Sequence, residues 1–468
     1  MEKTAAGTAD NTPKPLGQRV WVRVWVNVCR FVVALTFIFS GFVKAIDPLG
    51  TQYKIRDYLT ALNISDMVPD WGTLGMSVVL SAVEFCLGVF ILFAIHRRTC
   101  TKIAVALMTV MTTVTVWLWL EDPISDCGCF GDAIHLSNGQ TLLKNIVLLS
   151  CCIVIAWQPL SMMRFISKAN QWIVMHVTVL FIFFTSLWCL YTLPLFDFRP
   201  YHIGANIPQG MAIPEGEKEP EFTTTFILEK DGQQKEFTLD NYPDSTWIFV
   251  DSKTVQTSEG YVPPIHDFSI ERMDTGEDIT SAVLEDKGYT FLLISPHLED
   301  ANDSNFGEIA SLYEYANEHG YAFYGLTASG QAAVERWRDL TGADYPFCFT
   351  DETTLKTIIR SNPGLLLLKN GTIIQKWSHN RLPTITQDQT ALRLEQLPMG
   401  KMPTDTVPDK LAFILMWYVL PLTVLTLGDR LWTGGKWLLR RHRARRKGAA
   451  QAGSDDGASQ QTPPSPTA

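Results

Sequence analysis

The chain has 468 residues, of which 46% are apolar, and its formal net charge is −9. Because long stretches with almost no charge alternate with a central polar block, a single soluble globule is excluded. Nine cysteines in a chain of this length exclude a disulfide-stapled mini-protein. Lys and Arg gather in a few short segments instead of covering a face, which excludes a generally basic nucleic-acid binder.

Six segments are long and apolar enough to cross a hydrocarbon core of roughly 30 Å, which takes about 20 helical residues. They lie near residues 25–46, 72–95, 103–120, 141–158, 172–195 and 410–427. The first follows several basic residues and has no small-residue cleavage site. We therefore expect a retained anchor and not a removed signal peptide.

The short loops that carry Lys and Arg indicate the orientation, because positive charge resists translocation. Basic residues follow the second, fourth and sixth spans: Arg97, Arg98 and Lys102; Arg164 and Lys168; and six residues within 440–447. We expect these loops and both termini in the cytoplasm, and residues 197–408 in the periplasm of a bacterial inner membrane. The last basic run directly follows an apolar helix, which favours contact with lipid headgroups over nucleic acid.

The predicted fold class is a membrane α-helical bundle of four core helices plus two further spans, with an extracytoplasmic α/β domain. In chain order we expect a disordered cytoplasmic N-terminus (1–16), the transmembrane bundle (17–196), a β-rich extracytoplasmic linker region (197–260), the α/β domain (261–405), the sixth transmembrane helix (408–430), and a basic, then low-complexity cytoplasmic tail (431–468). Both termini are too poor in apolar residues to order themselves.

Charged groups within the spans are costly in lipid and usually face a bundle interior or a cavity. Glu84 lies near the middle of the second span, whereas Lys44 ends the first span and Lys144 opens the fourth. Glu84 paired with either lysine would be a structural ion pair. Unpaired and beside a water path, it would be a proton-handling group.

The loop EDPISDCGCFGDAIHLSNGQ between the third and fourth spans is the sharpest chemical feature of the chain. Cys127 and Cys129 lie one glycine apart on the expected oxidising side, where thiols form and exchange disulfides. Closing so small a ring requires an extended local backbone, and Gly128 removes the Cβ obstacle. Three alternatives stay open: pairing of the two thiols with partners elsewhere, a structural turn, and a metal site completed by Asp126, Asp132 or His135. Cys151 and Cys152 in the fourth span are expected to be packing residues, with an electron relay from the loop as the alternative.

Three motifs, SGFVKAIDP, the Glu-bearing second helix and DCGCFGD followed by QTLLKNIVLL, resemble the four-helix membrane domain of the MauE family, within the DoxX-like group. The resemblance covers roughly residues 26–160. It implies functional positions at Lys44, Glu84, Cys127 and Cys129, a role in maturing a disulfide-rich partner protein, and an architecture similar to quinone-linked vitamin K epoxide reductases. The two-pair cysteine relay of those reductases is not implied, because no cysteine lies between the first two spans.

The polar block alternates strand-like and helix-like stretches from PPIHDFSI onward, which predicts βαβ units and a mostly parallel sheet. Its KNG turn predicts a hairpin. Residues 261–385 resemble thioredoxin-like domains of the TlpA and peroxiredoxin type, with Pro363 at the position of the family's cis-proline. Where redox-active members carry a dithiol, this sequence has SPHLEDAND, without a cysteine. Cys348 lies in an apolar strand, where we expect it to be buried in the core. Asn362 and Pro363 would then frame a groove for an extended client polypeptide. The acidic residues of SPHLEDAND are expected to face solvent or to cap the following helix or, alternatively, to bind a cation.

The sequence thus favours thiol/disulfide-linked maturation of envelope proteins. Cys127 and Cys129 would exchange electrons, Glu84 would handle the associated proton, and a quinone is a candidate electron partner. The main alternative is a non-catalytic, membrane-anchored thioredoxin-like interaction module in which CGC is a structural turn. A small-solute carrier, suggested by Lys44 and Glu84, comes last, because the chain shows no inverted repeat or broken-helix pair.

Overall fold

The computed structural model describes residues 20–124, 127–217, 221–230, 233–238, 248–258 and 260–458. Two compact units emerge. The helical domain comprises Met1–Leu190, Pro194–Phe196 and Asp405–Ala468, and the α/β domain comprises Tyr191–Leu193 and Asp197–Thr404. The predicted fold class, a membrane-type bundle joined to an α/β domain, is confirmed.

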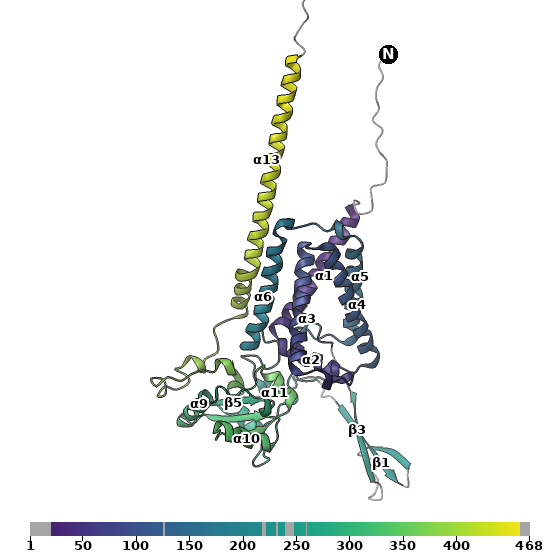
Figure 1. Ribbon diagram of the computed structural model, residues 1–468. Helices are drawn as coiled ribbons and strands as arrows, with labels where there is room; N and C mark the ends of the chain where they lie inside the picture. The colour runs from purple at the N-terminus through teal and green to yellow at the C-terminus, as the bar shows by residue number, and fades with distance from the viewer. Residues whose placement is uncertain are drawn as a thin grey trace, which may run out of the picture. The chain divides into compact units, whose positions relative to one another are not determined.

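Among the described residues, six helical segments are long and apolar enough to cross a membrane, as the hydropathy pattern predicts. Figure 1 shows four of these helices side by side in the bundle: α1 (Val20–Ile46), α3 (Asp70–Phe93), α4 (Arg97–Glu121) and α5 (Asn138–Trp157). The fifth segment contains α6 (Gln171–Tyr191), and the sixth begins with α12 (Val407–Ile414), the π-turn η10 (Leu415–Val419) and α13 (Leu420–Ala458). The helical domain is therefore built as a multi-pass membrane protein.

Two glycines bring α1 and α3 into close contact. A Cβ on Gly41 would lie 2.8 Å from the carbonyl oxygen of Ser81, and one on Gly88 would lie 2.7 Å from the backbone nitrogen of Ile38. Small residues let membrane helices approach closely enough for backbone packing. This contact places the middle of α3 directly against the C-terminal half of α1.

The last helix packs against α6 (Figure 1). The ring of Tyr418 stacks on Phe181 with centroids 4.0 Å apart, and its hydroxyl is 3.0 Å from Thr178 Oγ1. Asp429 accepts hydrogen bonds from Ser167 and Asn170 in the loop before α6. The sixth helix was expected to end near residue 430, but α13 continues to Ala458, through part of the predicted low-complexity tail. The predicted disordered segment 1–16 lies outside the described residues.

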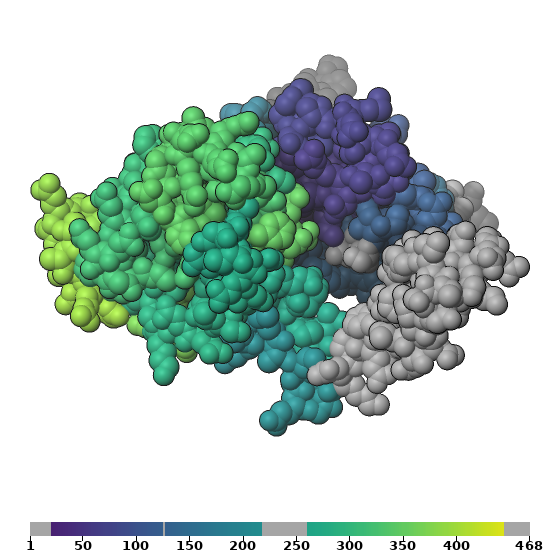
Figure 2. All heavy atoms as spheres, turned by 90° about the horizontal axis from the view of Figure 1, so that it is seen from below, coloured from purple at the N-terminus to yellow at the C-terminus, as the bar shows by residue number. Residues whose placement is uncertain are grey.

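Helix α2 (Pro48–Ala61) was not predicted from the sequence. Its N-terminus is capped by the Asp47 side chain, which accepts from Gly50 N at 2.9 Å, and Pro48 occupies the first turn. Both are standard helix-start signals, but the segment is too polar to stand out in a search for spans. Seen from below, α2 forms part of the surface at this end of the bundle (Figure 2).

A six-stranded sheet in the order β4-β7-β6-β5-β8-β9 forms the centre of the α/β domain. Its strands are β4 (Glu271–Arg272), β5 (Tyr289–Ser295), β6 (Ala322–Thr327), β7 (Phe347–Phe349), β8 (Gly364–Lys369) and β9 (Thr372–Ser378). Only β5–β6 and β6–β7 pair in parallel, so the prediction of a mostly parallel sheet was wrong. The physical reason is the β8–β9 hairpin, whose turn residues Asn370 and Gly371 both have positive φ, as its Asn-Gly sequence predicts.

The order of helices and strands, with a central β5 followed by a helix and parallel β6, is that of a thioredoxin-like domain. The helices are α8 (Thr280–Leu284), α9 (Phe306–His319), α10 (Gln331–Thr341) and α11 (Glu352–Ile358), with the short turn η7 at Leu298–Asp300. Strand β5 is buried along its whole length, between two apolar clusters. Cys348 is fully buried in β7, as predicted.

The expected linker region 197–260 is divided between two structures. Tyr201 and Ile207 belong to the core of the α/β domain, and Ile207, in α7 (Ile207–Met211), donates its backbone N–H to Gly371. A separate antiparallel sheet, ordered β2-β1-β3, follows with strands β1 (Glu221–Lys230), β2 (Gln233–Thr238) and β3 (Ile248–Ser258). The part of the predicted linker from Tyr201 to α7 therefore belongs to the domain itself.

Candidate functional site

The two thiols of the CGC loop face one another between α4 and α5. Cys127 Sγ and Cys129 Sγ are 3.0 Å apart, a hydrogen-bond contact between free thiols and about 1 Å longer than a covalent S–S bond. Gly128 between them has φ +63°, so the backbone is left-handed here and not extended as predicted. Glycine takes this conformation without the steric cost of a side chain.

Helices α1 and α2 hold the loop in place. Tyr58 of α2 donates its hydroxyl to the carbonyl oxygen of Cys127 at 2.7 Å, and Ser40 of α1 donates to that of Cys129 at 2.7 Å. A Cβ at Gly128 would lie 3.1 Å from the Lys54 side chain of α2. The loop thus lies against two helices, while both cysteines keep partial exposure.

Beneath the loop, Glu84 is paired with Lys44. Lys44 Nζ lies 2.9 Å from each carboxylate oxygen of Glu84, and both side chains are at least 92% buried. Ser40 donates to the same carboxylate at 2.8 Å. Of the two states that the sequence left open for Glu84, the structure has the ion pair, with Lys44 as the partner.

Lys144 supplies a second ammonium group to the thiols. It forms a hydrogen bond with Cys129 and lies 4.3 Å above the ring of Phe130. The hydrogen bond from Cys127, together with the charges of Lys144 and Lys44, holds the pKa of Cys129 below the usual cysteine value despite burial. The bond to Cys129 and burial raise the pKa of Cys127. Cys129 is therefore the thiol that ionises first.

A cavity of about 40 Å³ connects the thiol, the ion pair and the second lysine. Its lining includes Ser40, Lys44, Glu84, Cys129 and Lys144, with apolar residues of α1, α4 and α5 closing it. A single water needs roughly 10–15 Å³ of such space, so the cavity can hold one or a few waters but not an aromatic ring. Glu84 and Cys129 thus line the same small cavity.

The metal alternative for this loop finds no support in the described part of the chain, where His, Cys, Asp and Glu form no group of three able to hold an ion. Asp126, one of its candidate ligands, lies outside the described residues. The four residues to which the sequence assigned chemistry in this domain, Lys44, Glu84, Cys127 and Cys129, do converge on one site.

In the α/β domain, the place of the family's dithiol is filled by hydrogen-bonded polar residues. His297 Nε2 lies 2.9 Å from Glu352, and Ser329 donates to Glu299 at 2.6 Å. The side chains of this loop do not cap α9, whose N-cap residue Asn305 makes no side-chain cap bond. Of the two expectations for this loop, the cap is not formed, because Asn302 instead accepts from the nearby Ser304 backbone, whereas Glu299 and Asp300 are exposed to solvent.

The expected client groove lies beside the peptide bond between Asn362 and Pro363, which is cis, as the resemblance predicts. The Asn362 side chain accepts from Ser295 at 2.6 Å and donates to the His297 carbonyl at 2.8 Å. Its backbone carbonyl accepts from Asn302 N at 3.1 Å. A client strand that paired with Asn362 would have to replace this last bond.

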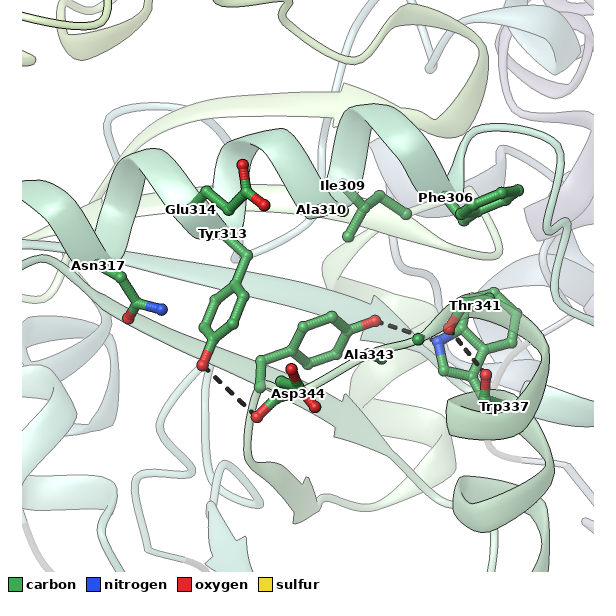
Figure 3. A pocket seen from close by; sticks show the side chains of 12 residues that line it. Phe306, Ile309, Ala310, Tyr313, Glu314, Asn317, Trp337, Thr341, Ala343 and Asp344 are labelled. Atoms are coloured by element: carbon green, nitrogen blue, oxygen red, sulfur yellow. Dashed lines mark hydrogen bonds between the residues drawn. The ribbon is translucent and has the colours of Figure 1, made fainter.

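A larger pocket of about 270 Å³ opens between α9, α10 and the segment that follows α10. Tyr313 extends from α9 toward the loop that carries Asp344, and Phe306 and Trp337 lie at the other end (Figure 3). Trp337 donates its indole N–H to the Tyr345 hydroxyl at 3.1 Å. The sequence analysis did not single out this pocket, since its residues are spread over 40 positions with no local motif.

Sequence reasoning also missed the two groups that fix the CGC backbone, Ser40 and Tyr58. Ser40 is one helical turn before Lys44 and so lies on the same face of α1, a periodicity that could have identified it. Tyr58 had no such signal, because it acts from the unpredicted helix α2.

Comparison with known proteins agrees with the division into two domains. Residues 22–158 match the family model of methylamine utilisation protein MauE, and residues 222–259 match a domain of unknown function, DUF8463. No curated protein matches the chain significantly. Among solved structures, one match is a "putative protein disulfide isomerase" from Bacteroides thetaiotaomicron, with 17% identity over 25% of this chain and 76% of that one, and a TM-score of 0.21. Residues 22–158 thus form a MauE-type membrane domain, in a chain that continues into an α/β domain of thioredoxin-like topology.

Proposed function

We propose that this protein is an inner-membrane thiol-disulfide oxidoreductase component, in which the Cys127–Cys129 disulfide accepts electrons from dithiols of envelope proteins during their maturation. The observation that carries the proposal is a thiol pair in contact beside two ammonium groups, with the pKa of Cys129 lowered. The short loops rich in Lys and Arg favour both termini in the cytoplasm, with the CGC loop and residues 197–408 in the periplasm.

Charge balance sets the direction of electron flow. In the reduced site, the Cys129 thiolate and the Glu84 carboxylate face Lys44 and Lys144, so the four charges cancel. In the oxidised site the thiolate charge is gone, and one ammonium group has no anion. A dithiol whose reduced form is stabilised in this way makes an oxidising disulfide.

The reaction proceeds by two exchanges. A client thiolate attacks Cys129 Sγ, which breaks the Cys127–Cys129 bond and leaves a mixed disulfide, while Cys127 takes up a proton. The second client thiolate then attacks the client sulfur of the mixed disulfide and releases Cys129 as a thiolate. The client gains one disulfide, and the site gains two electrons.

Glu84 and Lys44 serve this exchange as a buried proton and charge reservoir. The cavity joins Glu84 to Cys129, so a water within it can carry a proton from the client thiol toward the carboxylate. Reoxidation requires a two-electron acceptor, for which a membrane quinone is the natural class. The cavity beside Cys129 is too small for a quinone ring, so the acceptor would meet the thiols from the membrane surface. The α/β domain would hold the extended client at Asn362 and Pro363.

The test is a trapping experiment in membranes. Cys127→Ser keeps the Cys129 thiolate, which can attack the disulfide of an oxidised client in the reverse of the second exchange, and removes Cys127, which would otherwise displace the client from that mixed disulfide. We therefore expect client proteins to accumulate as mixed disulfides that reductant releases. Cys129→Ser should trap far less, because the remaining Cys127 ionises poorly. Cys348→Ser is the matched control and should behave as the wild type. Equal trapping by the two loop variants, or none by either, would overturn the assignment.

A further inference from the structure

Four arginines gather around the loop that joins α5 to α6, at the end of the bundle opposite the CGC loop (Figure 1). Three of them donate hydrogen bonds to backbone carbonyl oxygens of residues 160–165: Arg97 to Leu160 and Met162 at 3.0 and 2.7 Å, Arg30 to Met163 at 2.7 Å, and Arg430 to Phe165 at 3.0 Å. The fourth, Arg164, belongs to the loop itself. Six residues span at most about 22 Å even when fully extended, so four positive charges share a short stretch of chain.

The protein supplies little negative charge to balance these arginines. The segments at this end of the domain contain a single acidic residue, Asp429. These segments are residues 20–31, 94–104, 158–172 and 424–436. The Asp429 carboxylate is buried and already accepts hydrogen bonds from Ser167 and Asn170. Within the part of the chain that the structure describes, none of the four arginines forms a salt bridge.

The four side chains differ in how many of their donors the protein uses. Arg30 is fully buried and uses all three nitrogens, on carbonyl oxygens of α3 and the loop and on a side-chain amide. Among the described residues, Arg97 and Arg430 each use one nitrogen, and Arg164 uses none, with its Nε buried and without a partner. Arg97 and Arg164 are half-buried and Arg430 is exposed, so their remaining N–H groups are open to a ligand.

The first turn of α4 adds positive charge at the same place. Helix α4 begins at Arg97, and it has no side-chain cap and no acidic residue in its first turn. The N-terminus of a helix carries a partial positive charge, which a bound anion stabilises and a neighbouring arginine does not. The unused guanidinium donors and the uncapped helix start therefore favour the same kind of ligand, an anion.

We propose that Arg97, Arg164 and Arg430 bind the phosphate of an anionic phospholipid headgroup. Guanidinium groups match the oxygens of phosphate in geometry and in charge. Large apolar side chains next to these arginines in the chain fit acyl chains, for which a soluble phosphate has no counterpart. They are 60–71% exposed and comprise Trp157, Leu160, Met163 and Trp172. Tryptophan is typical of the headgroup level of a bilayer. The site does not depend on the role proposed for the CGC loop.

The test measures lipid binding to the full chain, purified in detergent and freed of lipid, by native mass spectrometry. The probes are phosphatidylglycerol, phosphatidylcholine, whose phosphate carries its own ammonium group, and glycerol 3-phosphate, a soluble headgroup. We expect phosphatidylglycerol to bind at least about ten times more tightly than phosphatidylcholine, and a hundredfold excess of glycerol 3-phosphate not to displace it. Arg164→Gln should weaken phosphatidylglycerol binding about tenfold, the effect of losing one hydrogen bond between charged groups.

Two further variants separate a specific site from general attraction. Lys102→Gln removes the same charge from an exposed position of α4 and should change the affinity less than about twofold. The basic run 440–447 is present in every variant, so its contribution cancels. Arg430→Gln should weaken binding as Arg164→Gln does, and it serves as the test if Arg164→Gln does not fold.

Three results would contradict the proposal. Equal binding of the two lipids would show that the arginines do not select an anionic headgroup. Displacement by glycerol 3-phosphate would identify a soluble phosphate as the ligand. Affinity that is unchanged in the arginine variants, or reduced as much in Lys102→Gln, would show that these arginines only hold the loop.

Discussion

The two domains differ in whether they contain two neighbouring thiols. In the helical domain, Cys127 and Cys129 lie 3.0 Å apart with two lysines beside them. In the α/β domain, the segment after β5 that carries the dithiol in thioredoxin-like proteins has His297 and Glu299 instead, each hydrogen-bonded to a neighbour. The domain whose topology is associated with thiol chemistry lacks the thiols, and the membrane domain has them.

The difference shows that the reactive site depends on its local electrostatics and not on the fold around it. A thioredoxin-type dithiol draws part of its low pKa from the N-terminus of the helix that follows. Here α9 begins only at Phe306, after the η7 turn and a short loop. The helical domain reaches a lowered pKa at Cys129 by another route, through a neighbouring thiol and two ammonium groups.

The largest effect is expected on stability, at the ion pair that underlies the CGC loop. Glu84→Gln leaves Lys44 buried without its anion, and breaking a buried pair in this way costs about 3–5 kcal/mol. Thermal unfolding of the detergent-solubilised chain measures the loss. Glu299→Gln in the α/β domain is the control: its carboxylate is exposed, and its change should stay within about 0.5 kcal/mol. Equal losses of stability in the two variants would show that Glu84 is not paired with Lys44 as it is in the structure.

A smaller effect is expected from Lys144→Gln, which removes one of the two cations beside Cys129. We expect the pKa of Cys129, about 6 in the folded chain, to rise by about 1, and its alkylation rate at pH 5, below both pKa values, to fall about tenfold. The pH profile of Cys129 alkylation, followed by mass spectrometry, gives the midpoint directly. Lys102→Gln, in α4 at the opposite end of the bundle, should leave that midpoint in place, and a matching shift there would argue against a local charge effect.

The same lowered pKa predicts how the stability of the reduced chain depends on pH. In the unfolded chain, Cys129 has the ordinary cysteine pKa of about 8.5, so between the folded and unfolded values the unfolded state binds more protons. The stabilisation is therefore fully present above about pH 8.5 and is lost as the pH falls through the folded pKa of Cys129. In Lys144→Gln the folded pKa of Cys129 is higher. The pH range in which the Cys129 thiolate stabilises the folded chain should therefore begin at a higher pH.

Much of the architecture was predictable because it depends on local patterns. Hydropathy located all six spans, and the Asn370-Gly371 turn located the hairpin. The long-range contacts were not predictable. Ser40 and Cys129 are 89 positions apart, and only the packing of the CGC loop against α1 brings them together. Helix α2 was not predicted for the opposite reason. Its start signals, Asp47 and Pro48, are local, but the amino-acid composition of the segment resembles that of a loop.

The site itself was predicted as a set of residues but not as a geometry. The sequence placed Lys44 and the two cysteines near one end of the bundle and Glu84 near the middle of the second span. It could not tell that Glu84 is paired with Lys44 and that Lys144 belongs to Cys129, because that choice depends on the close α1–α3 contact at Gly41 and Gly88. Gly41 and Gly88 lie far apart in the sequence, so their effect on which lysine pairs with Glu84 can be seen only once the packing of α1 against α3 is known.

The smallest effect is expected when a dithiol is installed in the α/β domain. In His297→Cys/Asp300→Cys, the two cysteines have the two-residue spacing of a thioredoxin motif, but they precede the N-terminus of α9 by several residues. Both thiols should therefore titrate near the ordinary value of about 8.5 and exchange slowly at pH 7. The measurement is alkylation against pH in a chain with Cys127→Ser and Cys129→Ser, and the unsubstituted CGC site is the reference. If the new pair reacted as fast as that reference at pH 7, the fold alone would be enough to activate a thiol. The two domains would then differ only in whether cysteines stand at the reactive positions, and not in their electrostatics.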